Sequence, residues 1–165
     1  MSQTPADEFR FRSPDQRYGI DLHGKIVDRV LAACAGTGRC ETGGIIVGSY
    51  NRERTCAIVS DVGSSPQDSL AGASWYSRGV KGVQQWLNSL WWDRRYYLGE
   101  WHFHPFGVAV PSDVDVCQML DIAGDPLYSC PEPILVIVGG DPHTDWHVGA
   151  FQFLRGRDWF PLALC

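Results

Sequence analysis

The chain has no apolar run long enough to span a membrane, and its first residues include no apolar segment of the secretory-signal type. A membrane-spanning helix needs about 20 consecutive apolar residues. We therefore expect a cytoplasmic protein with no membrane partner.

Paired cysteines are also lacking. The six cysteines include no CxxC pair and do not show the spacing of small secreted disulfide-rich domains. This pattern predicts a reduced intracellular chain whose thiols are mostly buried. A cysteine nucleophile facing a histidine stays an open alternative, although no sequence context marks one.

Clusters of basic residues are absent as well. The chain carries 14 Lys and Arg against 19 Asp and Glu, for a formal net charge of −5, and its basic residues are scattered. This distribution excludes the electrostatic footprint of a nucleic-acid-binding protein. The stretch Gly79-Val-Lys-Gly82 lacks the spacing of a phosphate-binding loop, so we expect neither a nucleic-acid partner nor a nucleotide site.

The length and composition of the chain are typical of a globular protein. The 165 residues are 44% hydrophobic and 20% charged, which suits one domain with a usable core. We expect residues 1–7 to be disordered and residues 8–165 to form that domain. Seven tryptophans are many for this length. They indicate a Trp-rich core or, alternatively, a groove for an extended peptide lined by Trp75, Trp101 or Phe106.

Helical and alternating apolar patterns are interspersed along the chain. They predict a single domain of the α/β (α+β) class, with a curved mixed β-sheet and about three helices. The expected helices cover residues 24–34, 79–92 and 112–122. The expected strands cover residues 8–11 (as an edge strand), 42–50, 56–62, 96–104, 134–138, 146–154 and 159–164.

The strand expected at residues 96–104 carries two histidines. His102 and His104 are two positions apart, so on a strand both side chains point to the same face. Asp115 follows after a short loop, and two histidines with one carboxylate suit a zinc ion that keeps a position open for water. Ser112-x-x-Asp115 is also a helix capping box, and capping is compatible with metal binding by Asp115.

A hydrolytic zinc ion lowers the pKa of bound water to near ~7 and needs a general base beside it. Two carboxylates qualify. Glu41 begins the strand expected at 42–50, and Glu100 shares the strand and face of the histidines. The residues alone do not choose between them. A second His/Asp set, formed by His143, Asp145 and His147, occupies a turn and strand with no fourth partner in view.

The combination of Glu41, His102-x-His104-Pro105 and Ser112-x-x-Asp115 resembles the JAMM (MPN+) zinc metalloprotease signature. The segments 41–48 and 97–105 are similar to the prokaryotic JAB branch, and the resemblance spans about residues 41–122. Within that branch, residues 77–86 resemble the deconjugases encoded beside E1/E2-like enzymes in bacterial antiphage systems, including CBASS.

This resemblance implies a role for each residue of the motif. His102, His104 and Asp115 would bind one Zn²⁺ ion, Glu41 would be the general base, and Ser112 would hydrogen-bond the oxyanion. Phe103 stands where the family often has Ser or Thr. Strand alternation turns Phe103 away from the metal, so we expect altered packing or substrate fit.

The implied function is a zinc-dependent isopeptidase or peptidase that cleaves after the C-terminal tail of a ubiquitin-like or similarly conjugated protein, in a bacterial antiviral system. Its partners would be that conjugate and E1/E2-like proteins of the same operon. Two alternatives stay open: a peptidase that releases amino acids from a small sulfur-carrier protein, and a non-catalytic MPN scaffold.

Overall fold

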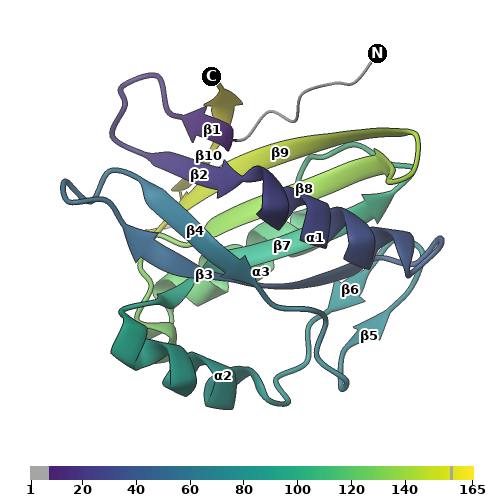
Figure 1. Ribbon diagram of the computed structural model, residues 1–165, viewed down its shortest axis with the longest axis horizontal. Helices are drawn as coiled ribbons and strands as arrows, with labels where there is room; N and C mark the ends of the chain where they lie inside the picture. The colour runs from purple at the N-terminus through teal and green to yellow at the C-terminus, as the bar shows by residue number, and fades with distance from the viewer. Residues whose placement is uncertain (1–7, 157) are drawn as a thin grey trace.

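The computed structural model describes residues 8–156 and 158–165. Eight of its strands close into a barrel in the order β1-β10-β9-β8-β7-β3-β4-β2 (Figure 1). These strands are β1 (Glu8–Arg12), β2 (Gly19–His23), β3 (Thr42–Tyr50), β4 (Ala57–Val62), β7 (Tyr96–Pro105), β8 (Ile134–Asp141), β9 (Asp145–Leu154) and β10 (Asp158–Leu164). The remaining elements are the two-stranded sheet of β5 (Leu70–Ala71) and β6 (Tyr76–Ser77), the helices α1 (Gly24–Ala35), α2 (Val83–Leu90) and α3 (Asp113–Gly124), and the 3-10 turns η1 (Trp91–Asp93) and η2 (Pro126–Tyr128).

The barrel wall is apolar on both faces, because α1 covers one side and α2 and α3 lie on the other. Ile46 packs with α1, whereas its neighbours Ile45 and Val47 pack with residues of α2 and α3. Side chains of β8 also alternate between the two faces, with Val136 on the α1 side and Ile137 on the α3 side. A strand buried on both faces reads as a continuous apolar run, as residues 134–138 do.

The pairing of β3 with β7 brings the start of β3 beside the histidines. The two strands are antiparallel, and Thr42 lies opposite Phe103 while Gly43 lies opposite His102. A Cβ atom on Gly43 would lie 2.4 Å from the carbonyl oxygen of Trp101, so only glycine permits this approach. Glu41, one residue before β3, is thereby placed next to the end of β7.

The predicted mixed α+β fold with three helices is confirmed, but some details were wrong or missed. Strand β1 is not an edge strand, because it pairs with β10 on one side and β2 on the other. Strand β2 was not predicted; it forms an antiparallel hairpin with β1 and pairs in parallel with β4, a partner that lies far along the chain.

The predicted helix at 79–92 begins four residues late, at Val83. Gly82 adopts a left-handed conformation with φ of +79° and ends the preceding turn. Val80 and Lys81 donate their backbone N–H groups to the carboxylate of Asp68 and are therefore held to the preceding loop.

Within the described part of the chain, no helix has the length and apolar character needed to cross a membrane. All six cysteines are free thiols. Only half of them are buried, so the prediction of mostly buried thiols was too broad; the buried ones are Cys34, Cys56 and Cys130. The disorder expected for residues 1–7 lies outside the described residues.

Candidate metal centre

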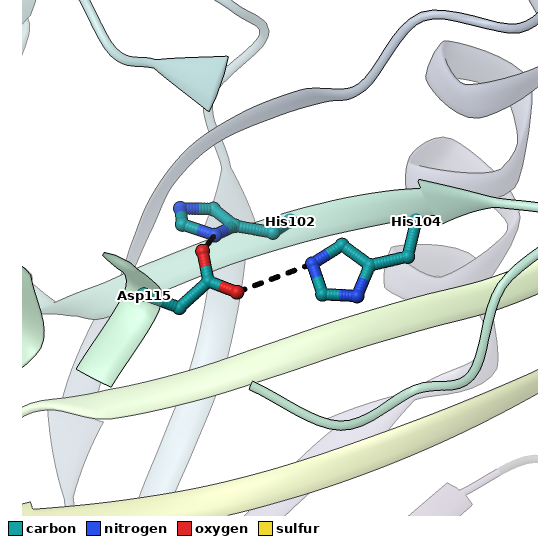
Figure 2. A group of neighbouring side chains, drawn as sticks. All are labelled: His102, His104 and Asp115. Atoms are coloured by element: carbon teal, nitrogen blue, oxygen red, sulfur yellow. Dashed lines mark hydrogen bonds and ion pairs between the residues drawn. The ribbon is translucent and has the colours of Figure 1, made fainter. Parts of the chain in front are cut away.

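Strand β7 presents His102 and His104 on the face that looks toward α3 (Figure 2). Between and beside them, Trp101 and Phe103 point to the opposite side and are buried in the core under α1. The alternation expected from the sequence is confirmed, and it explains Phe103: this side chain is a core residue with no access to the metal site.

Helix α3 supplies the third group of the site. Ser112 is the N-cap of α3, and its Oγ accepts a hydrogen bond from the Asp115 backbone N–H at 3.2 Å. In return, Asp115 Oδ2 accepts from the Ser112 backbone N–H and hydroxyl, both at 2.8 Å. The capping box is therefore complete, and it directs the Asp115 carboxylate at the two histidines.

The three side chains converge on one point. Asp115 Oδ1 lies 2.9 Å from Nδ1 of His102, and its Oδ2 lies 3.2 Å from Nε2 of His104 (Figure 2). One ligand atom from each residue falls within 4.8 Å of the other two, an arrangement close enough for a single ion. Two imidazole nitrogens and a carboxylate oxygen are donors that zinc takes, at about 2.0–2.2 Å each. The residues present therefore fit a zinc ion with a free fourth position.

The charges of the site favour an ionised carboxylate. Burial alone would raise the pKa of Asp115, but hydrogen bonds from His102 and His104 hold that pKa well below its usual range. Burial would likewise lower the pKa of His104, and its contact with Asp115 overrides this effect and raises it. His104 is further fixed by its Nδ1, which lies 3.2 Å from the carbonyl oxygen of Val108. When Nδ1 carries the proton, Nε2 keeps its lone pair for a metal.

Glu41 lies beside this group, as the strand pairing requires. Its side chain lines a cavity of about 440 Å³ together with His104, Val110 and Ser112. Partial burial raises the pKa of its carboxyl above the ordinary value; the charge of Asp115 adds to this, while the histidines oppose it. The carboxyl therefore lies next to the candidate metal ligands with its neutral form favoured relative to a free glutamate.

Glu100, the rival carboxylate, occupies a different environment. It is buried, and Arg78 donates to its two oxygens at 3.0 and 2.7 Å while the Tyr97 hydroxyl donates at 2.8 Å. It faces a second cavity of about 250 Å³, which His102 and Arg78 also line. Arg78 was not singled out from the sequence, because only the folded chain brings it to a strand 22 residues away.

The other sequence candidates fall outside the centre. His147 uses its Nε2 to accept a hydrogen bond from the Ala109 backbone N–H at 3.2 Å, and among the described residues the His143, Asp145 and His147 set does not form a metal group. Trp101 cannot line a peptide groove, because it is 1% exposed and its indole N–H donates to the Gly63 carbonyl. Trp75 and Phe106 are exposed, as a groove would require.

Comparisons with known proteins identify the family of the chain. A family model described as prokaryotic homologs of the JAB domain matches residues 23–152. A protein named CD-NTase/cGAS isopeptidase, from Enterobacter hormaechei subsp. hoffmannii, is 36% identical over 155 residues, covering 94% of this chain and 86% of that protein.

A solution structure of a Desulfitobacterium hafniense protein is similar in fold, with a TM-score of 0.60 and 16% identity over 83% of this chain and 85% of that one. At this identity the likeness concerns the fold alone. The family model and the 36% identical relative confirm the resemblance inferred from the motif: the chain belongs to the prokaryotic JAB-domain family.

Proposed function

We propose that this protein is a zinc-dependent isopeptidase that releases a conjugated protein from its target. The observation that carries the proposal is the convergence of His102, His104 and Asp115 beside a cavity that Glu41 and Ser112 also line. The proposal assigns metal binding and catalysis to one domain formed by residues 8–165.

Zinc held by this triad would polarise the scissile carbonyl and lower the pKa of a water molecule to near ~7. Glu41 would take a proton from the attacking water and pass it to the leaving amine. The C–O bond to the water oxygen would form first; the C–N bond would then break as the nitrogen receives the proton from Glu41, which returns to its ionised form. Partial burial supports this role, since it raises the pKa of Glu41 above its ordinary value and so makes the carboxylate a better proton acceptor than a free glutamate.

Ser112 would stabilise the negative charge that develops on the carbonyl oxygen. Its hydroxyl lines the cavity and donates to Asp115 Oδ2 at 2.8 Å in the absence of substrate. Turning the same hydroxyl toward the substrate oxygen would supply a fixed donor where charge appears, which is the usual work of an oxyanion hole. Ser112 would therefore serve both the helix cap and the reaction.

Glu41 is the better base on the grounds of its surroundings. Both oxygens of the Glu100 carboxylate already accept hydrogen bonds from Arg78 or Tyr97, so they are engaged in the buried ion pair and not directed at an attacking water. The backbone N–H of Glu41 donates a hydrogen bond to the Gly72 carbonyl, and its side chain lines the cavity.

The substrate we propose is a ubiquitin-like or similarly conjugated protein attached through its C-terminal tail, in a bacterial antiviral system. The relative from Enterobacter supports this assignment, because its name describes an isopeptidase acting on a CD-NTase/cGAS enzyme. E1/E2-like proteins would form the bond that this protein cleaves. We expect the reaction in the cytoplasm, where such enzymes work.

The experiment is a cleavage assay on conjugates made by the E1/E2-like enzymes of a bacterial antiviral system. Zinc-loaded protein should cleave the isopeptide bond, whereas the chelated protein and Asp115→Asn should not. If the zinc-loaded protein releases amino acids from a small sulfur-carrier protein and leaves every conjugate intact, the isopeptidase assignment is wrong. If the protein takes up no zinc, the isopeptidase assignment is also wrong, and the alternative of a non-catalytic scaffold is favoured.

A further inference from the structure

The segment between the second histidine and the cap of α3 is an irregular loop, residues 106–111, which lies against β8 and β9 (Figure 1). Two hydrogen bonds fix its start: the Phe106 N–H donates to the Gly140 carbonyl at 3.0 Å, and the Gly107 N–H donates to the His104 carbonyl at 3.1 Å. The loop connects two candidate ligands, so its path affects both.

Two glycines let the loop lie directly on the β8–β9 hairpin. A Cβ atom on Gly139 would lie 2.6 Å from the Gly107 carbonyl oxygen and 2.7 Å from the Ala109 nitrogen. A Cβ atom on Gly149 would lie 2.3 Å from the Ala109 carbonyl oxygen. Backbone-to-backbone approach of this kind is a common reason for glycine inside a strand.

His147 fastens the loop to this surface. It pairs with Gly139 across β8 and β9, and a Cβ on Gly139 would lie 2.9 Å from Nε2 of its ring. The missing side chain therefore leaves room for the imidazole, whose Nε2 accepts the hydrogen bond from the Ala109 N–H at 3.2 Å. Ala109 itself is buried against the core under α3.

The preceding residue, Val108, has its carbonyl next to the His104 ring. The Val108 oxygen lies 3.2 Å from His104 Nδ1, and His104 Nε2 lies 3.2 Å from Asp115. The contacts thus run from the His147 ring through two loop residues to a ligand of the metal centre. A carbonyl that accepts from a ligand histidine sets the ring's orientation and tautomer.

We propose that His147 is a positioning residue of the metal centre: by holding the 106–111 loop on β8 and β9, it places the Val108 carbonyl that orients His104 for zinc. This inference rests on the proposed function, because it assumes that His104 binds a metal. It assigns a role to a histidine that the sequence offered only as a member of a second metal set.

The test measures zinc affinity by competition with a chromophoric chelator, which needs no substrate. His147→Ala should weaken zinc binding by about tenfold, the lower end of the range for residues that orient metal ligands. His147→Gln should restore most of the affinity, because its amide oxygen can accept from the Ala109 N–H. The matched control is His143→Ala, an exposed histidine of the same hairpin whose side chain makes no hydrogen bond within the described part of the chain.

Thermal unfolding of the zinc-free variants separates positioning from general stability. The proposal predicts little change in the melting temperature for His147→Ala, because the ring is exposed and lies outside the core. Unchanged zinc affinity in His147→Ala would overturn the proposal. So would an affinity loss that accompanies a lower melting temperature and is not restored by Gln.

Gly149→Ala provides an independent variant that moves the loop without touching His147. Its Cβ would press on the Ala109 carbonyl and also on the buried ring of Phe151, so its melting temperature is measured alongside its zinc affinity. The affinity should fall, and an unchanged affinity in the folded variant would contradict the role of the loop. Failure of the proposed function is distinguishable from these outcomes. A wild-type protein that binds zinc and cleaves no conjugate would refute the isopeptidase, while the affinity series would still decide the role of His147.

Discussion

Arg78 donates its Nε–H group to both carboxylate oxygens of Glu100, and the pair is buried on the strand face that carries His102. The guanidinium also donates to the Tyr128 hydroxyl at 3.2 Å and to the Gly79 carbonyl at 2.8 Å. These bonds tie β7 to the segments before α2 and after α3. The wall next to the metal centre is thus held by an ion pair that takes no part in the proposed reaction.

Breaking this pair from one side should destabilise the fold. Arg78→Met leaves the Glu100 charge buried without its partner, and such a change costs about 3–5 kcal/mol of unfolding free energy. Urea denaturation measures the loss. The double variant Arg78→Met with Glu100→Gln should recover a large part of it, because no buried charge is then left alone. A single variant as stable as the wild type would show that the pair does not hold this wall.

Two variants separate the capping role of Ser112 from the catalytic role proposed for it. Ser112→Ala removes the cap of α3, at a cost of about 1 kcal/mol, whereas Ser112→Gly costs only a few tenths of a kcal/mol at an N-cap. Both remove the hydroxyl and should lower kcat by about 10²–10³-fold, as loss of one oxyanion donor does. Unfolding and turnover assays on the two variants give the comparison. If kcat falls only in the less stable variant, Ser112 is a helix cap and nothing more.

Removal of zinc should lower the stability of the protein measurably. A ligand at 100 times its Kd stabilises the folded state by about 2.7 kcal/mol. In a protein of this size each kcal/mol shifts the melting temperature by about 2–4 °C. Thermal unfolding with and without a chelator should therefore differ by several degrees. The same chelator should cause no shift in a variant lacking His102, His104 and Asp115.

The cavity beside Glu41 should contact the substrate chain. Val110 lines this cavity from the 106–111 loop, and its side chain is 51% exposed. Val110→Asp should raise KM for the conjugate with little change in zinc affinity, because an apolar contact is replaced by a charge that must be desolvated. Steady-state kinetics measure the effect. Trp92→Asp is the control, since this exposed side chain lies on η1 and lines neither cavity described above; an equal rise in KM would contradict a local contact.

The local parts of the fold were predictable from the sequence. The capping box of α3 and the strand of His102 and His104 each depend on residues close in the chain, and both formed where the patterns indicated. Residues 42–50 matched the bounds of β3, because a β-branched run flanked by polar residues has few other structures to adopt.

The features that sequence reasoning missed depend on distant contacts. Strand β2 pairs with the distant strand β4 as well as with its neighbour β1, and the buried pair of Arg78 with Glu100 joins segments that are separate in the chain. The roles of Glu41 and Ser112 were expected from the family resemblance, since their residue types alone allowed a solvated carboxylate and a simple cap. The structure adds their convergence on one cavity, which no local pattern encodes.

The most direct test of the proposed function is the turnover of zinc-loaded Glu41→Gln on an isopeptide conjugate, with its zinc content measured in the same sample. We predict one zinc per chain and a kcat lower by about 10²–10⁴-fold, the usual contribution of a general base. The matched variant Glu100→Gln breaks the ion pair with Arg78 and should be less stable, but its folded, zinc-loaded fraction should keep kcat within a few-fold of the wild type. Full activity in Glu41→Gln, or loss of activity only in Glu100→Gln, would contradict the assignment of the base and of the catalytic centre built around it.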